Sequence, residues 1–172
     1  MSNKHLIQRH WYLLTSKPHK DVLAEEQLLR QGYEIYRPLA QRLRKRGGKM
    51  QAITESLFPR YIFIHLDTIN DNWRPIRSTI GVQGFVRFGL EPARVPEELI
   101  SQIRDQESDL GAKAIDLDRF HQGDVVTLKD GPYQGLRGVF LSYNGEQRAM
   151  ILLEILNCKA PLEVPTVKLM AA

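Results

Sequence analysis

Hydrophobic and polar positions divide the first two thirds of the chain into strands and helices. Residues 11–16 and 61–66 are short aromatic and apolar runs, typical of strands in the middle of a sheet. Residues 20–31 and 96–107 carry helix formers with acidic residues near their starts, and Gly32 directly follows the first segment. These segments predict two central strands and two helices.

Shorter segments complete the predicted N-terminal part. Residues 33–39 and 84–89 favour strands, and residues 42–49 place a double glycine among cations, which is typical of a hairpin tip. Residues 70–78 are polar and predict a helix turn or an ordered loop. The order of these elements predicts an α/β sandwich in which helices cover a mixed sheet.

The last third of the chain combines a turn motif with a segment of conflicting preference. Residues 120–143 set β-branched runs around the core DGPYQG, which predicts two strands folded on a tight corner; an ordinary glycine-rich hairpin is the alternative. Residues 147–157 are rich in Ala, Met, Leu and Glu, whereas a barrel strand favours β-branched residues. That segment stays open between helix and strand, and residues 164–169 predict a last strand.

Residues 108–119 lack clear periodicity and predict a linker between two domains, residues 1–107 and 120–172. Through residue 107 the chain has 17 Lys and Arg against 12 Asp and Glu, while the remainder has 7 against 8. The basic charge therefore belongs to the first domain, which is expected to meet a polyanion.

The overall composition, with 42% hydrophobic and 26% charged residues, is ordinary for globular protein. No apolar run approaches the roughly 20 residues of a membrane span, and the start of the chain lacks the apolar core of a signal peptide. We therefore expect a cytoplasmic protein without a membrane partner. The single cysteine, Cys158, fits a reducing compartment and is interpreted as a packing residue.

The residue inventory argues against an enzyme. The chain shows no nucleophile–base arrangement, no phosphate-binding glycine loop and no metal-ligand spacing among its five histidines. We expect neither a catalytic residue nor a metal or other cofactor.

Cations gathered at the predicted hairpin tip are candidate contacts for nucleic acid, because each neutralised phosphate releases counterions. A solvated tip that resists aggregation is the alternative. Cations before the first helix lie in the same predicted domain and extend the patch. The candidate DNA-binding residues from charge are Lys17, His19, Lys20, Arg42, Arg44, Lys45 and Arg46.

Several stretches resemble the NusG family of transcription factors across nearly the whole chain. These stretches are WYLLTSKPHK, SLFPRYIFI, GVQGFVRFG and residues 123–140, the last of which resembles the KOW motif. The resemblance implies an α+β protein: an N-terminal NGN domain, which is an α/β sandwich, and a small C-terminal KOW domain. That KOW domain is a β-barrel, or an α-helical hairpin in an autoinhibited state of the specialised RfaH branch, which this chain resembles most.

The resemblance also implies a function. A factor of this kind binds the clamp helices and gate loop of RNA polymerase, contacts the non-template DNA strand and reduces pausing or termination. Its KOW domain then engages a small-subunit ribosomal protein or Rho, and we expect a monomer. The alternatives are a housekeeping NusG-like factor that engages Rho, and a KOW-type protein that binds RNA or the ribosome.

Residue by residue, the resemblance assigns three groups. Lys17 and Thr79 match the DNA-recognition region, and Glu55 and Arg148 match positions that pair between the two domains. The polymerase-binding candidates are Trp11, Phe58, Tyr61, Phe63, Phe88, Asn72, Trp73 and Arg74.

The chain departs from the branch at two places in the DNA and gate-loop region. Ile80 stands where the branch has an arginine, and NDNWRPIRS replaces a threonine-rich run. Gly135 and Gly138 are closer to the standard KOW barrel, and glycine costs about 1 kcal/mol in a helix, so the first helix of a hairpin would be poorer here.

Overall fold

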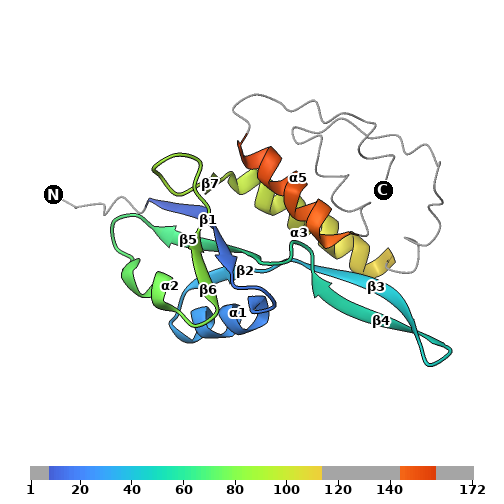
Figure 1. The fold of residues 1–172 in the computed structure, drawn as a ribbon. Coiled ribbons are helices and arrows are strands. Elements are labelled where there is room, and N and C mark those ends of the chain that lie inside the picture. The colour runs from blue at the N-terminus through green and yellow to red at the C-terminus, as the bar shows by residue number, and fades with distance from the viewer. Residues whose placement is uncertain (1–7, 114–143, 158–172) are drawn as a thin grey trace. The chain divides into compact units, whose positions relative to one another are not determined.

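The computed structural model describes residues 8–113 and 144–157 of the 172-residue chain. Contacts divide the chain into two compact units. The helices and strands are labelled in Figure 1. The first comprises Met1–Arg37 and Arg60–Glu98, and the second comprises Pro38–Pro59 and Leu99–Ala172. Each unit is described by itself.

The first unit contains an antiparallel sheet with strand order β2-β5-β1-β6, in which β7 also pairs with β1. The strands are β1 (Arg9–Ser16), β2 (Glu34–Tyr36), β5 (Tyr61–Asp67), β6 (Val82–Phe85) and β7 (Arg94–Val95). The expected mixed sheet is therefore wrong for the described strands. Because β5 lies between β1 and β2, these two strands run in the same direction without pairing with each other.

Strand register decides which residues enter the core of this unit. Successive side chains of a strand point to opposite faces, so Tyr12 and Leu14 share one face with Ile64 and Ile62, their partners across β1 and β5. Helix α1 (Asp21–Arg30) and helix α2 (Arg74–Ser78) add buried residues to this face. The core consists of Tyr12, Leu14, Ala24, Leu28, Ile62, Ile64, Leu66, Ile76 and Val82.

Helix α1 confirms the prediction from residues 20–31, with Asp21 in its first turn and Arg30 in its last. Gly32, at φ +87°, follows the end, where glycine is favoured. Helix α2 has a proline in its first turn, and it confirms a helix turn within residues 70–78.

The second unit contains a two-stranded hairpin, β3 (Leu39–Arg46) and β4 (Lys49–Ser56). Gly47 and Gly48 join the strands with φ values of +60° and +79°, which side chains other than glycine rarely adopt. The predicted hairpin tip is confirmed. The remaining described elements are α3 (Glu97–Lys113), which enters this unit at Leu99, and α5 (Gly145–Asn157).

Three predicted segments differ from the observed elements. The strand expected at residues 84–89 is β6, Val82–Phe85, whose last ladder pair with β1 joins Phe85 to Leu14. The strand expected at residues 33–39 is only Glu34–Tyr36, and Pro38 separates it from β3. Helix α3 continues to Lys113, so residues 108–113 of the expected linker are helical.

The turn motif at residues 120–143 and the expected strand at residues 164–169 lie outside the described residues, as does the rest of the expected linker. The domain division at residue 107 stays a prediction. No helix in the part of the chain that the structure describes is long and apolar enough to cross a membrane.

Candidate functional site

The second face of the sheet in the first unit carries a row of aromatic side chains. Trp11 and His65, which are paired across β1 and β5, stack with ring centroids 4.6 Å apart and planes 9° apart. Tyr36 and Phe63 stack at 6.1 Å. By strand alternation these residues point away from the core face that α1 and α2 line. We call Trp11, Tyr36, Tyr61, Phe63 and His65 the aromatic face.

Charged groups hold the edge of the aromatic face in place. The Nδ1 atom of His65 lies 2.8 Å from a carboxylate oxygen of Glu34, and a guanidinium nitrogen of Arg9 lies 3.7 Å from the same oxygen. His65 is thereby fixed against Trp11. Within the aromatic face, Trp11 and Phe63 are buried, and Tyr36, Tyr61 and His65 are half-buried.

The apolar binding candidates are distributed over both units. Trp11 and Phe63 are buried and Tyr61 is half-buried on the aromatic face. Phe58, which belongs to the second unit, is fully buried, and Phe88 is 39% exposed in the loop after β6. The structure therefore gathers three of these residues on one surface, together with Tyr36 and His65, which the sequence did not single out.

The gate-loop candidates lie in the segment between β5 and α2. Trp73 stacks on Phe85 at 5.4 Å, meets Tyr12 edge-on at 4.8 Å and donates a hydrogen bond from its indole nitrogen to the Asp67 carbonyl. It therefore supports the core and borders the surface. Asn72 and Arg74 are exposed.

An open pocket of about 500 Å³ lies against Trp73. Its lining residues are Tyr12, Thr68, Trp73, Glu91, Pro92 and Arg94. No sequence pattern predicted this pocket, because residues far apart in the chain form it.

The carboxylate of Asp67 organises the loop that carries Asn72 and Trp73. One oxygen accepts hydrogen bonds from the backbone nitrogens of Ile69 and Asn70, and the other accepts one from the Asn70 side chain at 2.8 Å. The Asn70 side-chain hydrogen bond, followed by the backbone hydrogen bond from Ile69, lowers the pKa of Asp67.

This lowered pKa predicts an acid-dependent loss of stability. The ionised carboxylate stabilises the fold above its unfolded-state pKa of about 3.9, and the contribution is lost as pH falls through the lower folded-state pKa. We expect the melting temperature of the native chain to exceed that of Asp67→Asn near neutral pH and to converge with it in strong acid. Melting curves across pH check this, with Asp105→Asn on α3 as control. A constant difference at every pH would contradict it.

The cations before α1 form an exposed basic turn. Lys17, His19 and Lys20 are all exposed, and His19 has a φ of +60°. The Lys20 amide donates to the Lys17 carbonyl, and the Lys17 amide donates to the Gly81 carbonyl at 2.8 Å. This anchoring fixes the turn beside Gly81.

The other DNA candidates differ in their surroundings. Lys45 and Arg46 are exposed at the hairpin tip, which belongs to the second unit; Arg42 and Arg44 lie on β3, and their side chains lie outside the described part. Thr79 is 7% exposed, donates its hydroxyl to the Pro75 carbonyl and accepts from Gln31 at 2.9 Å. Its neighbour Ile80 is 65% exposed and is the residue that faces solvent.

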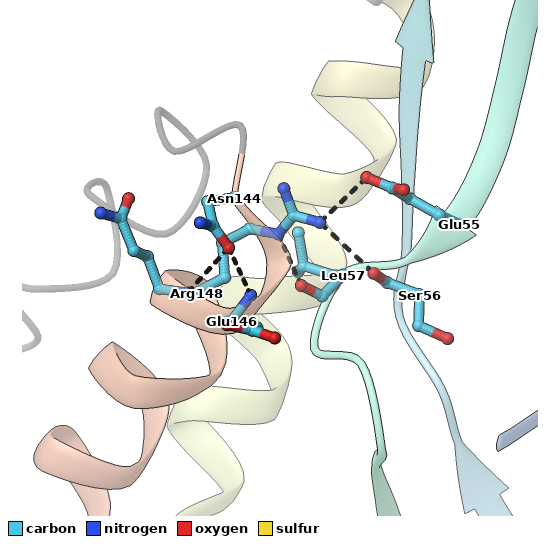
Figure 2. Close-up of polar contacts among 7 residues, drawn as sticks. Glu55, Ser56, Leu57, Asn144, Glu146 and Arg148 are labelled. Atoms are coloured by element: carbon cyan, nitrogen blue, oxygen red, sulfur yellow. Dashed lines mark hydrogen bonds and ion pairs between the residues drawn. The ribbon is translucent and has the colours of Figure 1, made fainter. Parts of the chain in front are cut away.

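Arg148 is the most deeply buried cation among the described residues, at 3% exposure (Figure 2). Its Nε donates to the Leu57 carbonyl at 2.6 Å, and Nη2 lies 3.2 Å from a Glu55 carboxylate oxygen and 3.4 Å from the Ser56 carbonyl. The sequence named the Glu55 partner, but it gave no sign of the two backbone carbonyls. These contacts tie α5 to the end of β4 and to the residue that follows it, within the second unit.

The start of α5 fits its surroundings closely. The side-chain oxygen of Asn144 accepts hydrogen bonds from the backbone nitrogens of Glu146 and Gln147, which caps the helix (Figure 2). A Cβ atom at Gly145 would lie 2.5 Å from the Pro59 side chain, so only glycine fits without a shift. The segment that the sequence left open between helix and strand is helical in this structure.

The described residues hold no group of three or more His, Cys, Asp or Glu side chains placed to bind a metal ion. The aromatic face and the basic turn hold the apolar and cationic candidates, whereas the Arg148 contacts are buried and internal to the second unit.

The sequence was compared with those of known proteins. The family model described as "Transcription termination factor nusG" matches residues 9–104. The chain is 28% identical over 128 residues to the "Transcription termination/antitermination protein NusG" of Thermus thermophilus, with 70% of each chain covered. It is 28% identical over 133 residues to the protein of that name from Deinococcus radiodurans, covering 69% of this chain and 70% of the relative.

The NusG protein of Streptomyces virginiae is 24% identical over 149 residues, and the match covers 77% of this chain but only 50% of the relative. A solved structure described as "Domain interaction in Thermotoga maritima NusG" is 18% identical, with a TM-score of 0.39. It covers 73% of this chain and 64% of that one.

Proposed function

The chain belongs to the NusG family, whose model matches more than half of it, and on that premise we propose that it binds RNA polymerase and promotes transcript elongation or antitermination. The family consists of transcription factors rather than enzymes. The aromatic face is the observation that carries this proposal. A sheet with one face packed on its own helices and a second face of stacked aromatic rings would offer apolar area to a partner in a state that exposes Trp11 and Phe63, which are buried in this structure.

We assign the polymerase contact to Trp11, Tyr61 and Phe63, with the clamp helices as the partner. Interface hot spots are enriched in tyrosine and tryptophan, and half-buried Tyr61 presents both an apolar ring and a hydroxyl. Exposed Asn72 and Arg74 are assigned to the gate loop. The basic turn is assigned to the non-template DNA strand.

We further propose a closed state that resembles the specialised RfaH branch. The helical state of residues 145–157 supports it, because α5 is bonded through Arg148 to residues 55–57. Phe58, a polymerase-binding candidate, comes directly after residue 57 and is fully buried. When the contacts at Arg148 open, residues 55–58 are released from α5. The C-terminal domain then recruits a ribosomal protein or Rho.

Retention by core RNA polymerase tests this function. We expect Tyr61→Ala to weaken binding about 30-fold, which corresponds to about 2 kcal/mol for an aromatic hot spot. The assay uses the full chain and the full chain with Glu55→Ala, which favours the open state. Leu29→Ala, at a 53% exposed apolar residue on α1 of the first unit, is the control.

Two outcomes would contradict the proposal. The first is no retention of either native or Glu55→Ala protein. The second is equal retention of the Tyr61→Ala and Leu29→Ala chains, which would remove the aromatic face from the interface.

A further inference from the structure

Arg60 has an unusual backbone conformation in the first unit. Its φ is +74°, a left-handed conformation that costs energy for any residue with a Cβ atom and that glycine adopts freely. Its backbone is held there, because the Ser16 amide donates to the Arg60 carbonyl at 2.8 Å. Such strain in a folded protein often marks a functional position.

The Arg60 side chain is held as firmly as its backbone. Its Nε donates to the Ser16 carbonyl at 3.1 Å, and its Nη2 donates to the side-chain oxygen of Gln83 at 2.7 Å. The guanidinium therefore has a fixed direction, although the residue is only half-buried.

A β-bulge places Gln83 against this guanidinium. Thr15 pairs with Gly84 and Ser16 pairs with Val82, so Gln83 is the extra residue of β6 at the irregularity. Bulges re-aim side chains, and they are common next to functional sites. The left-handed turn residue before β5 and the bulge of β6 thus meet in one side-chain contact.

The positive charge of the Arg60 guanidinium is not balanced by a carboxylate in the part of the chain that the structure describes. Arg37, Arg148 and Arg9 each lie within 4.0 Å of a carboxylate, those of Glu25, Glu55 and Glu34. Among the described residues the side-chain partners of Arg60 are a backbone carbonyl and a neutral amide, and no carboxylate pairs with it. A rigid guanidinium whose contacts are neutral keeps its full charge for an external anion.

The neighbourhood of Arg60 is basic. Lys17 directly follows Ser16, whose carbonyl accepts from Arg60, and it begins the exposed basic turn. We propose that Arg60, held by Ser16 and Gln83, is a phosphate-binding site that extends the basic turn and fixes the backbone of a single-stranded nucleic acid. The inference rests on the proposed function, because it adds a contact to the DNA surface assigned there.

A phosphate is favoured over a protein carboxylate by the exposed cations of the adjoining turn. A nucleic-acid strand presents phosphates at regular intervals, and Lys17 and Arg60 then neutralise successive groups. An isolated carboxylate would use only one of them.

The test uses full-length protein and a fluorescent single-stranded DNA of mixed sequence, with affinity measured at several salt concentrations. Arg60→Gly removes the cation and also relieves the left-handed strain, so the melting temperature is not expected to fall. We expect affinity to fall several-fold at low salt and the slope of log affinity against log salt to become shallower by about 0.7, the value for one single-strand phosphate. Arg94→Gln, the loss of an exposed arginine in the same unit, is the control and leaves the slope unchanged.

Gln83→Glu supplies an independent variant. It keeps Arg60 and places a carboxylate against it, which neutralises the site internally. We expect the same loss of affinity as for Arg60→Gly, whereas Gln83→Ala is expected to retain most of the binding.

Three outcomes would overturn the inference, and they distinguish its failure from failure of the proposed function. If Lys17→Gln weakens DNA binding and Arg60→Gly does not, the inference fails and the DNA surface stands. If native protein binds no DNA, both fail. If Arg60→Gly weakens only retention by RNA polymerase, the anion is a protein carboxylate and the phosphate site is wrong.

Discussion

Replacing Glu55 with alanine is expected to destabilise the helical state of residues 145–157 by about 2–4 kcal/mol, because it removes the carboxylate from a buried guanidinium. Arg148 is 3% exposed, and its Nη2 lies 3.2 Å from the Glu55 carboxylate. The Glu55 side chain itself is 29% exposed, so the effect falls below that of a fully buried pair.

Backbone chemical shifts of residues 145–157 in full-length protein measure this effect. We expect helical shifts in the native chain and a marked loss of them in Glu55→Ala. In the proposed open state, these residues report strands instead. Helical shifts that are unchanged in Glu55→Ala would contradict the prediction.

A double mutant separates the ion pair from the packing around it. Arg148→Met keeps most of the side-chain volume, and Glu55→Ala with Arg148→Met removes both charges. Replacing a buried pair by apolar groups is often neutral, so the double variant is expected to be more helical than Glu55→Ala alone. Equal losses in the single and double variants would show that packing, and not charge, decides the state.

Replacing Gly81 with alanine is expected to destabilise the first unit by about 2–5 kcal/mol. Its φ is +89°, where a Cβ atom costs about 1–2 kcal/mol. The added Cβ would also lie 3.0 Å from the Ala24 backbone nitrogen and 3.2 Å from the Lys20 carbonyl. Crowding against backbone adds about 1–3 kcal/mol, since neither neighbour is a flexible side chain.

Gly32 provides a matched control, because its φ is +87° and nothing lies within 4 Å of an added Cβ. Gly32→Ala therefore carries the conformational cost without the crowding. Chemical denaturation measures the free energy of unfolding of both variants, and the difference between them reports the crowding at Gly81. Equal destabilisation would mean that α1 moves away from Gly81 at no cost, which would contradict the close approach of helix and strand.

The sequence predicted the elements whose signals are local. The glycine pair at Gly47 and Gly48 marks its own turn, and α1 carries its charge pattern and its terminal glycine within a single segment. The helix at residues 145–157 agrees with its helix-forming composition, although the sequence left that segment open between helix and strand. For the turn at Gly47 and Gly48 and for α1, the residues that form the element are the same residues that predict it.

The candidate site depends on which residues of β1 and β5 pair with each other, and a local sequence pattern does not contain that information. Residue type alone cannot tell which rings of β1 and β5 face the core, since register decides that Tyr12 turns toward α1 and Trp11 turns away. The buried hydroxyl of Thr79 and the guanidinium of Arg60 depend on residues 48 and 44 positions away in the chain. An arginine also gives no sequence signal for a left-handed backbone.

The exposed hairpin of β3 and β4 has a consequence for motion. Most of β4 is exposed, and the two strands pair only with each other in the part of the chain that the structure describes. An isolated ribbon of this kind is only marginally stable, whereas the sheet of the first unit has a buried core. The hairpin can therefore open and reclose as its own cooperative unit, and fluctuations of its basic tip leave the aromatic face folded.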